Sequence, residues 1–160
     1  MTGKLQKIFV AALAVAGLIG SGVVSAGQKK VDLPEDHRSW DHVRSTVIHD
    51  RNNPLFGFLS IYANAEALKS LKGDAPYSEG STFVGIFHDV VDNGGIMTQG
   101  KRLKYVVMTK GSQFESTGGW GFEAFDAEGK TALTQDARAE CYQCHTQVSS
   151  TDYVFSKFVK

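Results

Sequence analysis

The sequence is poor in cysteine and proline and carries no excess of charge of either sign. Its 160 residues contain two cysteines, three prolines, and 17 basic against 17 acidic side chains. A chain of this length fits one ordinary domain, which excludes a multidomain enzyme. Without a basic surplus, nucleic acid is not an expected partner. Because 42% of the residues are hydrophobic, long-range disorder is not expected either.

Long apolar segments are lacking as well. The apolar run Ile8–Ile19 near the N-terminus has 12 residues, whereas a transmembrane helix needs about 20. Two lysines, Lys4 and Lys7, precede this run, and small residues ending at Ala26 follow it. This layout predicts a secretory signal peptide over residues 1–26 that is cleaved after Ala26. An uncleaved membrane anchor is the alternative.

Cleavage would leave one soluble domain, residues 27–160, in the periplasm. Removing Lys4 and Lys7 leaves 15 basic against 17 acidic side chains, a net charge of −2. We therefore expect no membrane association after cleavage. Export also permits oxidation of a cysteine pair, so a disulfide is one interpretation of the two cysteines.

The mature chain is rich in β-type runs separated by turn residues. The β-type composition of these runs and the turn signals between them predict an antiparallel sheet accompanied by short helices, an α+β class dominated by β-structure. Proline and apolar spacing predict a first helix, and Asn64 is a predicted N-cap for the second. The predicted strands are 55–62, 82–91, 104–109 and 120–126, and the predicted helical segments are 34–47, 65–71 and a helix or turn over 135–146.

The chemistry of the chain is indicated by the pattern Cys141-Tyr142-Gln143-Cys144-His145. C-x-x-C-H is typical of covalent c-type haem attachment. Two thiols one helical turn apart can add to the two vinyl groups of one porphyrin, while the next side chain reaches the iron. The motif predicts one covalently attached haem c, with Cys141 and Cys144 as its attachment points and His145 as the axial ligand of the iron. The C-terminal segment is then the haem-attachment segment.

Three other interpretations of the cysteines fit less well. A disulfide does not use the adjacent histidine, and a thioredoxin-like redox pair lacks the βαβ context it would need. A zinc site needs a second cysteine or histidine pair to complete four ligands. The remaining histidines are scattered along the chain at His37, His42, His49 and His88.

A sixth iron ligand would have to come from upstream of the motif. Only 15 residues follow His145, and none of them is methionine or histidine. The upstream candidates are Met97, Met108 and His88, each of which also fits an ordinary structural role. The working hypothesis is a five-coordinate iron with an open or water-occupied distal face.

Aromatic side chains are the candidates for the lining of that distal face. If residues 82–91 form a strand, Phe83 and Phe87 share one side with Gly85, and Phe56 and Phe58 share one side of the preceding strand. An apolar lining favours small diatomic ligands over charged substrates. Ordinary core packing is the competing interpretation for each phenylalanine.

The chain resembles the cytochrome P-460 family over nearly all of its mature length. The resemblance is carried, in the expected order, by residues 34–40, 61–64, the Tyr77–Gly80 turn, 117–123, the CYQCH motif and 152–156. It implies a β-dominated c-haem fold that is commonly a homodimer.

The family has two functional branches, and the resemblance carries an expectation for each. Cytochrome P-460 oxidises hydroxylamine and has its haem cross-linked to a strand lysine, whereas cytochrome c′-β lacks the cross-link and binds nitric oxide and carbon monoxide in an apolar, Phe-capped pocket. The cross-linking position aligns with Gly85, and no lysine lies between Gly73 and Gly100. The resemblance thus favours gas binding. Hydroxylamine oxidation and six-coordinate electron transfer to an unidentified redox partner are the alternatives.

Overall fold

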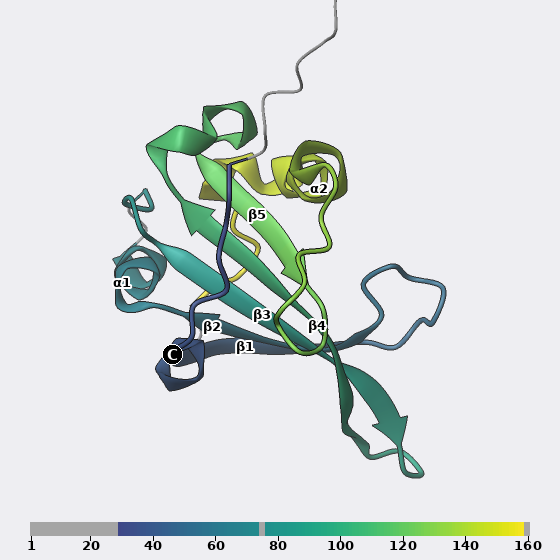
Figure 1. Ribbon diagram of the computed structural model, residues 1–160. Helices are drawn as coiled ribbons and strands as arrows, with labels where there is room; N and C mark the ends of the chain where they lie inside the picture. Colours follow the sequence, from purple (N-terminus) through teal and green to yellow (C-terminus); the bar gives the residue numbers. More distant parts are fainter. Residues whose placement is uncertain (1–28, 74–75, 159–160) are drawn as a thin grey trace, which may run out of the picture.

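A computed structural model describes residues 29–73 and 76–158 of the chain. Its centre is one five-stranded antiparallel sheet in which every strand pairs with its neighbours in sequence, in the order β1-β2-β3-β4-β5 (Figure 1). The strands are β1 (Asp41–Ile48), β2 (Gly57–Ala63), β3 (Thr82–Asp92), β4 (Met97–Lys110) and β5 (Trp120–Phe125). The predicted β-dominated α+β class is confirmed. The predicted signal peptide lies outside the described residues.

The pairing register assigns each side chain to one of two faces of the sheet. In antiparallel pairs, directly opposed residues point to the same side. Gly85 is opposed by Ile61 on β2 and by Val106 on β4, and Val106 is opposed by Ala124 on β5. We call this side the motif face, because the cysteine motif packs on it, and the other side the opposite face.

A hydrophobic core covers the motif face at the end of the sheet where β3 and β5 begin and β4 ends. Phe83, Met108, Trp120 and Phe122 contribute buried side chains from the sheet. They pack against α1 (Ala65–Gly73) and against Ala137 and Val154 of the C-terminal segment. The C-terminal segment is therefore part of the core.

The opposite face has a core of its own. Val84, Ile86, Tyr105, Val107 and Phe125 are buried there. Two other segments cover them. The first is the lead-in to the sheet, through Val31, Leu33 and Trp40, and the second is the 3-10 segment η2 (Ser112–Thr117), through Phe114.

The predicted helix over residues 34–47 is wrong. The chain forms only one 3-10 turn there, η1 (His37–Ser39), and then enters β1. β-branched residues dominate the end of this segment, and they pair with β2 from Val47↔Phe58 to Ile48↔Gly57. Stiff β-branched side chains and the available strand partner outweigh the apolar spacing that suggested a helix.

The second predicted helix and its cap are confirmed in α1. The side-chain oxygen of Asn64 accepts hydrogen bonds from the backbone N–H groups of Ala67, at 2.9 Å, and of Thr82, at 3.1 Å. Its amide nitrogen donates to the Gly80 carbonyl at 2.9 Å. One side chain thus caps the helix and ties it to the start of β3.

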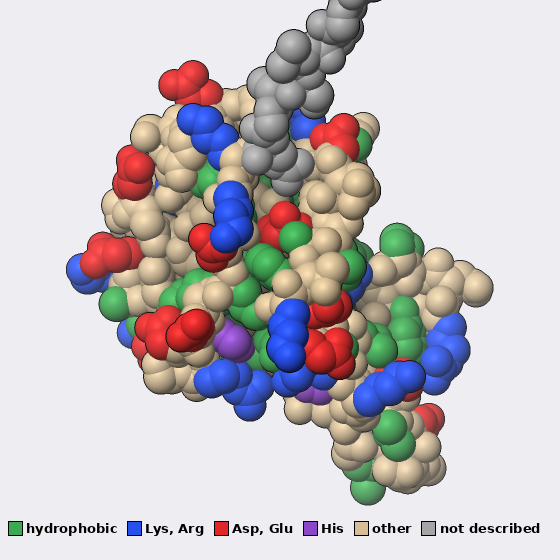
Figure 2. All heavy atoms as spheres, viewed as in Figure 1, with side chains coloured by type: hydrophobic (Ala, Val, Ile, Leu, Met, Phe, Trp, Pro, Cys, Tyr) green, Lys and Arg blue, Asp and Glu red, His purple; other side chains and the backbone are tan. Residues whose placement is uncertain are grey.

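Two loops extend from the body of the molecule. The β3–β4 hairpin and the loop between β1 and β2 both project beyond the sheet (Figure 1). The surface view shows acidic and basic side chains interspersed rather than gathered by sign (Figure 2). No helix within the described residues is long and apolar enough to cross a membrane.

Candidate haem site

The cysteine motif lies on consecutive helical turns near the C-terminus: η3 (Arg138–Tyr142, π-helical), α2 (Gln143–His145) and η4 (Thr146–Thr151, 3-10). The start of this segment is capped from both sides. The Asp136 carboxylate accepts from the backbone N–H of Arg138 at 2.9 Å, and the Glu140 carboxylate reaches back to the N–H groups of Gln135 and Asp136 at 3.0 and 2.8 Å. These bonds satisfy the free donors of the first turn. The predicted helix or turn is confirmed.

The two cysteines are free thiols in different surroundings. Cys141 is half-buried against the core of the motif face, whereas Cys144 is exposed. Burial, reinforced by the negative charges of Glu140 and Glu123, raises the pKa of the Cys141 thiol to about 11, and the Lys104 ammonium opposes this rise. Both thiols are available to add to a porphyrin, one from the core side and one from the solvent side.

The imidazole of His145 is oriented for metal binding. Its Nδ1 lies 2.7 Å from the Tyr153 carbonyl oxygen. A carbonyl can only accept, so Nδ1 carries the proton and Nε2 keeps its lone pair for a metal. Burial lowers the pKa of His145, which favours the neutral ring that binds iron. The rings of Phe122 and Phe155 flank the imidazole at centroid distances of 4.9 and 5.1 Å.

Next to the hydrophobic core, towards the middle of β3, the motif face continues as an apolar surface. Leu59, Ile61 and Val106 are half-buried on it and surround the backbone of Gly85. A Cβ atom built on Gly85 would lie 2.7 Å from Val106 Cγ2 and 3.0 Å from Leu59 Cδ1, so the surface closes over the glycine. Two free thiols, one tautomer-fixed imidazole and an adjacent apolar surface fit a covalently attached haem. Iron in such a group supplies redox-active, Lewis-acidic chemistry.

Phe83 and Phe87 lie on the motif face, as the strand alternation predicts. Phe83 is buried, with its ring packed against Tyr77 and Trp120 at centroid distances of 5.6 and 6.3 Å. Phe87 is 2% exposed, and the Lys104 ammonium lies 5.0 Å from its ring centroid. Phe87 therefore lies beside the apolar surface around Gly85, and Phe83 belongs to the hydrophobic core of the motif face.

Phe56 and Phe58 are placed elsewhere. Phe56 precedes β2, which begins at Gly57, so the two do not share a strand face as predicted. Phe56 stacks under the Arg51 guanidinium at 4.6 Å. Phe58 is opposed by Val47 and His88, which puts it on the opposite face. That Phe56 and Phe58 line the distal side of the haem stays a prediction, and their positions away from the motif face do not favour it.

The candidate sixth ligands are also dispersed. Met97 is exposed at the start of β4 on the projecting hairpin. His88 faces away from the motif, and burial together with the charges of Arg102 and Arg38 lowers its pKa. Met108 is buried in the core of the motif face with Phe83 and Trp120. Within residues 29–73 and 76–158, no three histidine, cysteine or acidic side chains gather around a metal-sized site.

Three contributors to the site were missed by the sequence analysis. Lys104 lies on the motif face, as its even spacing from Val106 and Met108 in β4 could have indicated. The Phe155 ring contacts the His145 imidazole edge to face, and the Tyr153 carbonyl orients that imidazole. The last two lie in residues 152–156, which carry part of the family resemblance, but the local sequence does not show that the turn brings them to His145.

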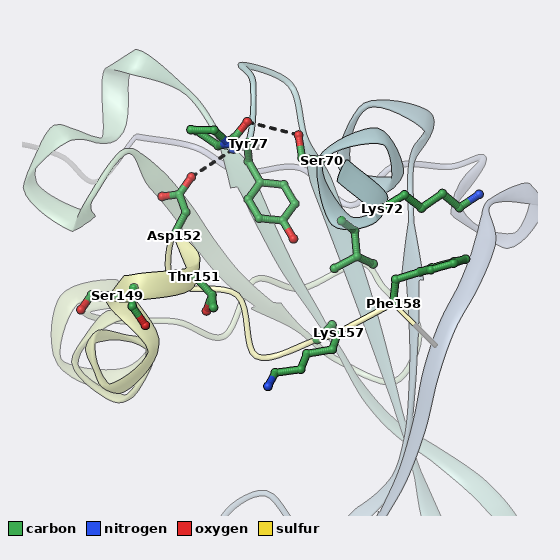
Figure 3. Close-up of a pocket in the computed structure, with 12 residues that line it drawn as sticks. Ser70, Lys72, Tyr77, Ser149, Thr151, Asp152, Lys157 and Phe158 are labelled. Atoms are coloured by element: carbon green, nitrogen blue, oxygen red, sulfur yellow. Dashed lines mark hydrogen bonds between the residues drawn. The ribbon is translucent and has the colours of Figure 1, made fainter. Parts of the chain in front are cut away.

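A groove lies beside the motif rather than at it. It has a volume of about 870 Å³ and runs between α1, residues 76–77 and the C-terminal tail, where Ser70, Tyr77, Asp152 and Phe158 line it (Figure 3). Neither cysteine nor His145 lines this groove. Its position thus separates it from the candidate haem site.

Comparison with known proteins agrees with the geometry. The family model described as Cytochrome P460 matches residues 34–156, which include the sheet, the motif and the turn that orients His145. No curated protein gave a significant match. Membership of this family implies a haem cofactor, and the free thiols and oriented imidazole are suited to hold it. The chain belongs to the cytochrome P460 family.

Proposed function

We propose that the protein is a periplasmic mono-haem c cytochrome that binds nitric oxide and related small gases at a five-coordinate iron. In this proposal, Cys141 and Cys144 hold one haem by thioether bonds and His145 is the axial ligand. The observation that carries it is the apolar motif face around Gly85. The side chains of Leu59, Ile61 and Val106 have no charge and no hydrogen-bonding group. The Lys104 ammonium on the same face lies against the Phe87 ring at 5.0 Å.

The placement of the candidate sixth ligands supports the same proposal. Met97 is exposed on a hairpin and His88 faces away from the motif. Met108 is buried within the core of the motif face, and moving it to an iron would disturb the packing of its neighbours. A five-coordinate iron leaves one position for a small ligand, and an apolar surface excludes water and larger molecules from it.

Absorption spectra of the purified holoprotein test this proposal. We expect a high-spin ferrous spectrum that changes on adding carbon monoxide or nitric oxide. A six-coordinate ferrous spectrum that does not respond to either gas would overturn it. If replacing Met97, Met108 or His88 then abolished that low-spin spectrum, the protein would be an electron-transfer cytochrome with a protein redox partner.

Hydroxylamine oxidation is a second candidate, and Lys104 is the observation in its favour. Its ammonium lies on the motif face near Phe87, and its charge acts on Cys141. A lysine on β4 could therefore approach the haem although position 85 on β3 is glycine. Peptide mapping of the holoprotein would reveal a Lys104–haem bond directly.

A matched pair of variants separates the two functions. K104Q removes the ammonium from the motif face, and K101Q removes one from the exposed part of the same strand. For gas binding, we expect no lysine–haem peptide and no steady oxidation of hydroxylamine with an acceptor dye. Turnover that K104Q abolishes and K101Q retains would establish the oxidase instead.

Export and assembly complete the proposal. We infer cleavage after Ala26, which intact-mass analysis of protein from the periplasmic fraction tests. The family resemblance implies a homodimer, which light scattering of the purified protein tests. An intact leader or a monomeric mass would contradict the respective expectation.

A further inference from the structure

Two successive residues after the motif adopt left-handed backbone conformations. Asp152 has φ 50° and Tyr153 has φ 66°, and they are the two non-glycine residues with positive φ among those the structure describes. Such conformations are unfavourable for residues with a Cβ atom, most of all for a bulky one such as tyrosine. They persist where surrounding contacts hold them, and they cluster at functional sites.

The contacts that hold this turn converge on the carboxylate of Asp152. Lys110 Nζ donates to its two oxygens at 2.7 and 2.9 Å, and Trp120 Nε1 donates to it at 3.3 Å. The backbone N–H of Tyr77 also donates to it, at 3.3 Å, as the dashed line in Figure 3 shows. The side chains of Lys110 and Asp152 are 20% and 23% exposed, so water screens the ion pair only in part. We call these contacts the Asp152 clamp.

The clamp joins the sheet to the segment that orients the iron ligand. Lys110 ends β4 and Trp120 begins β5, and their registered pairing makes one rigid support. Lys110 is further fixed by the Gly118 carbonyl at 3.3 Å and by the Trp120 ring at 5.0 Å. Asp152 thereby ties its own backbone to the rigid end of the sheet.

The residue after Asp152 contacts His145 directly. The Tyr153 carbonyl accepts from His145 Nδ1 at 2.7 Å, while the Tyr153 N–H donates to the Val148 carbonyl at 3.0 Å. The Tyr153 ring lies against Gly118, where a Cβ atom would come within 2.5 Å of it. The direction of the carbonyl therefore depends on the same turn that the Asp152 clamp holds.

We propose that Asp152 is a positioning residue for the iron ligand: through its bonds to Lys110, Trp120 and Tyr77 it holds the turn that aims the Tyr153 carbonyl at His145 Nδ1. The inference rests on the axial role of His145 in the proposed function and is independent of which gas or substrate reaches the iron. A hydrogen bond from Nδ1 to a carbonyl increases the electron donation of the imidazole and stabilises ferric over ferrous iron. The Asp152 clamp thus sets the redox potential from a residue that does not contact the haem ligand itself.

The test compares holoprotein variants by redox titration and by the iron–histidine stretching band of the ferrous form. D152N removes the charge that holds Lys110, and K110Q removes the partner while leaving the carboxylate its bonds to Trp120 and Tyr77. In both we expect the ratio of ferrous to ferric protein at the wild-type midpoint to rise about tenfold, a rise in potential of about 59 mV for one electron. The iron–histidine frequency should fall in both. K110R retains the charge and should stay near wild type.

D32N is the matched control, because Asp32 forms an exposed ion pair with Lys30 at 2.6 Å, on the lead-in segment that covers the opposite face of the sheet. It should leave the potential and the stretching band unchanged. Folded D152N and K110Q holoproteins with wild-type values of both would overturn the positioning role. So would failure of both variants to load haem while K110R and D32N load it, since the clamp would then serve folding alone. If the wild type itself shows no iron–histidine band, the proposed function fails before any variant is compared.

Discussion

The surroundings of the two motif cysteines predict that they differ in reactivity. With a pKa of about 11, Cys141 is about one part in a thousand thiolate at pH 8. Its sulfur is also half-buried, whereas Cys144 is exposed. In the haem-free folded chain we expect iodoacetamide to modify Cys144 well before Cys141, as followed by peptide mass mapping at pH 8. In the urea-unfolded chain both should react at similar rates, and equal rates in the folded chain would contradict the burial of Cys141.

Gly85 is fixed by packing rather than by backbone conformation. An added Cβ would meet Val106 Cγ2 at 2.7 Å, and valine is stiff about χ1. We expect G85A to lower the free energy of unfolding by about 1–3 kcal/mol, the usual cost of overpacking, in urea denaturation. G73A is the control, because a Cβ there meets nothing within 4 Å.

A double-mutant cycle makes the Gly85 test specific. V106A removes the methyl group that G85A would meet, so the two substitutions together should cost less than the sum of their separate effects. Strict additivity would show that the methyl group introduced by G85A is accommodated in another way. The same packing argues against any large side chain at this position on the motif face.

At the scale of the element, Asn64 is the clearest link between local sequence and tertiary structure. It caps α1 and also bonds the Gly80 carbonyl and the Thr82 N–H. We expect N64A to reduce the free energy of unfolding by about 1–2 kcal/mol, at the upper end for a cap, because the tie to β3 is lost as well. N52A, in the exposed β1–β2 loop, should have little effect in the same urea titration. A loss no larger than that of N52A would contradict the dual role.

How far the sequence predicts each element depends on how local its determinants are. Asn64 before a run of helix formers, and a run rich in Val, Ile and Phe in β3, are local signals, and both elements were predicted. Most of β1 fell within the predicted helix 34–47, because its pairing with β2 is not visible in the local sequence. Phe58 shows the same limit, since alternation relates it to its own strand but only the register assigns its face.

The residues of the candidate site also divide into those that the local sequence predicts and those that only the fold brings together. The spacing of Cys141, Cys144 and His145 was visible because haem attachment imposes it on neighbouring residues. The Asp152 clamp was not, because Lys110 and Asp152 are 42 positions apart. A contact of that separation follows from the whole fold, in which the C-terminal segment packs back over the end of the sheet.

At the scale of the whole molecule, the sheet separates the two histidines whose pKa burial lowers, His145 on the motif side and His88 on the opposite face. The motif face carries the oriented His145 and its apolar surroundings. The opposite face carries His88, whose pKa is lowered by burial and by the charges of Arg102 and Arg38. A lowered pKa in the folded state means that the unfolded chain binds the proton more tightly. The contribution of His88 to stability is therefore complete above about pH 6.5 and is lost as the pH falls through its folded-state pKa.

H88Q isolates this contribution from other acid-sensitive groups. Between pH 7.5 and 5 we expect the free energy of unfolding to fall less in H88Q than in wild type, because the variant has no proton to gain at this position. H49Q is the matched control, since His49 is exposed in the β1–β2 loop, and it should follow wild type. His145 and the carboxylates remain in all three proteins, so their effects cancel in the comparison. Parallel pH profiles for wild type and H88Q, measured by urea denaturation, would show that the opposite face accepts the proton without cost.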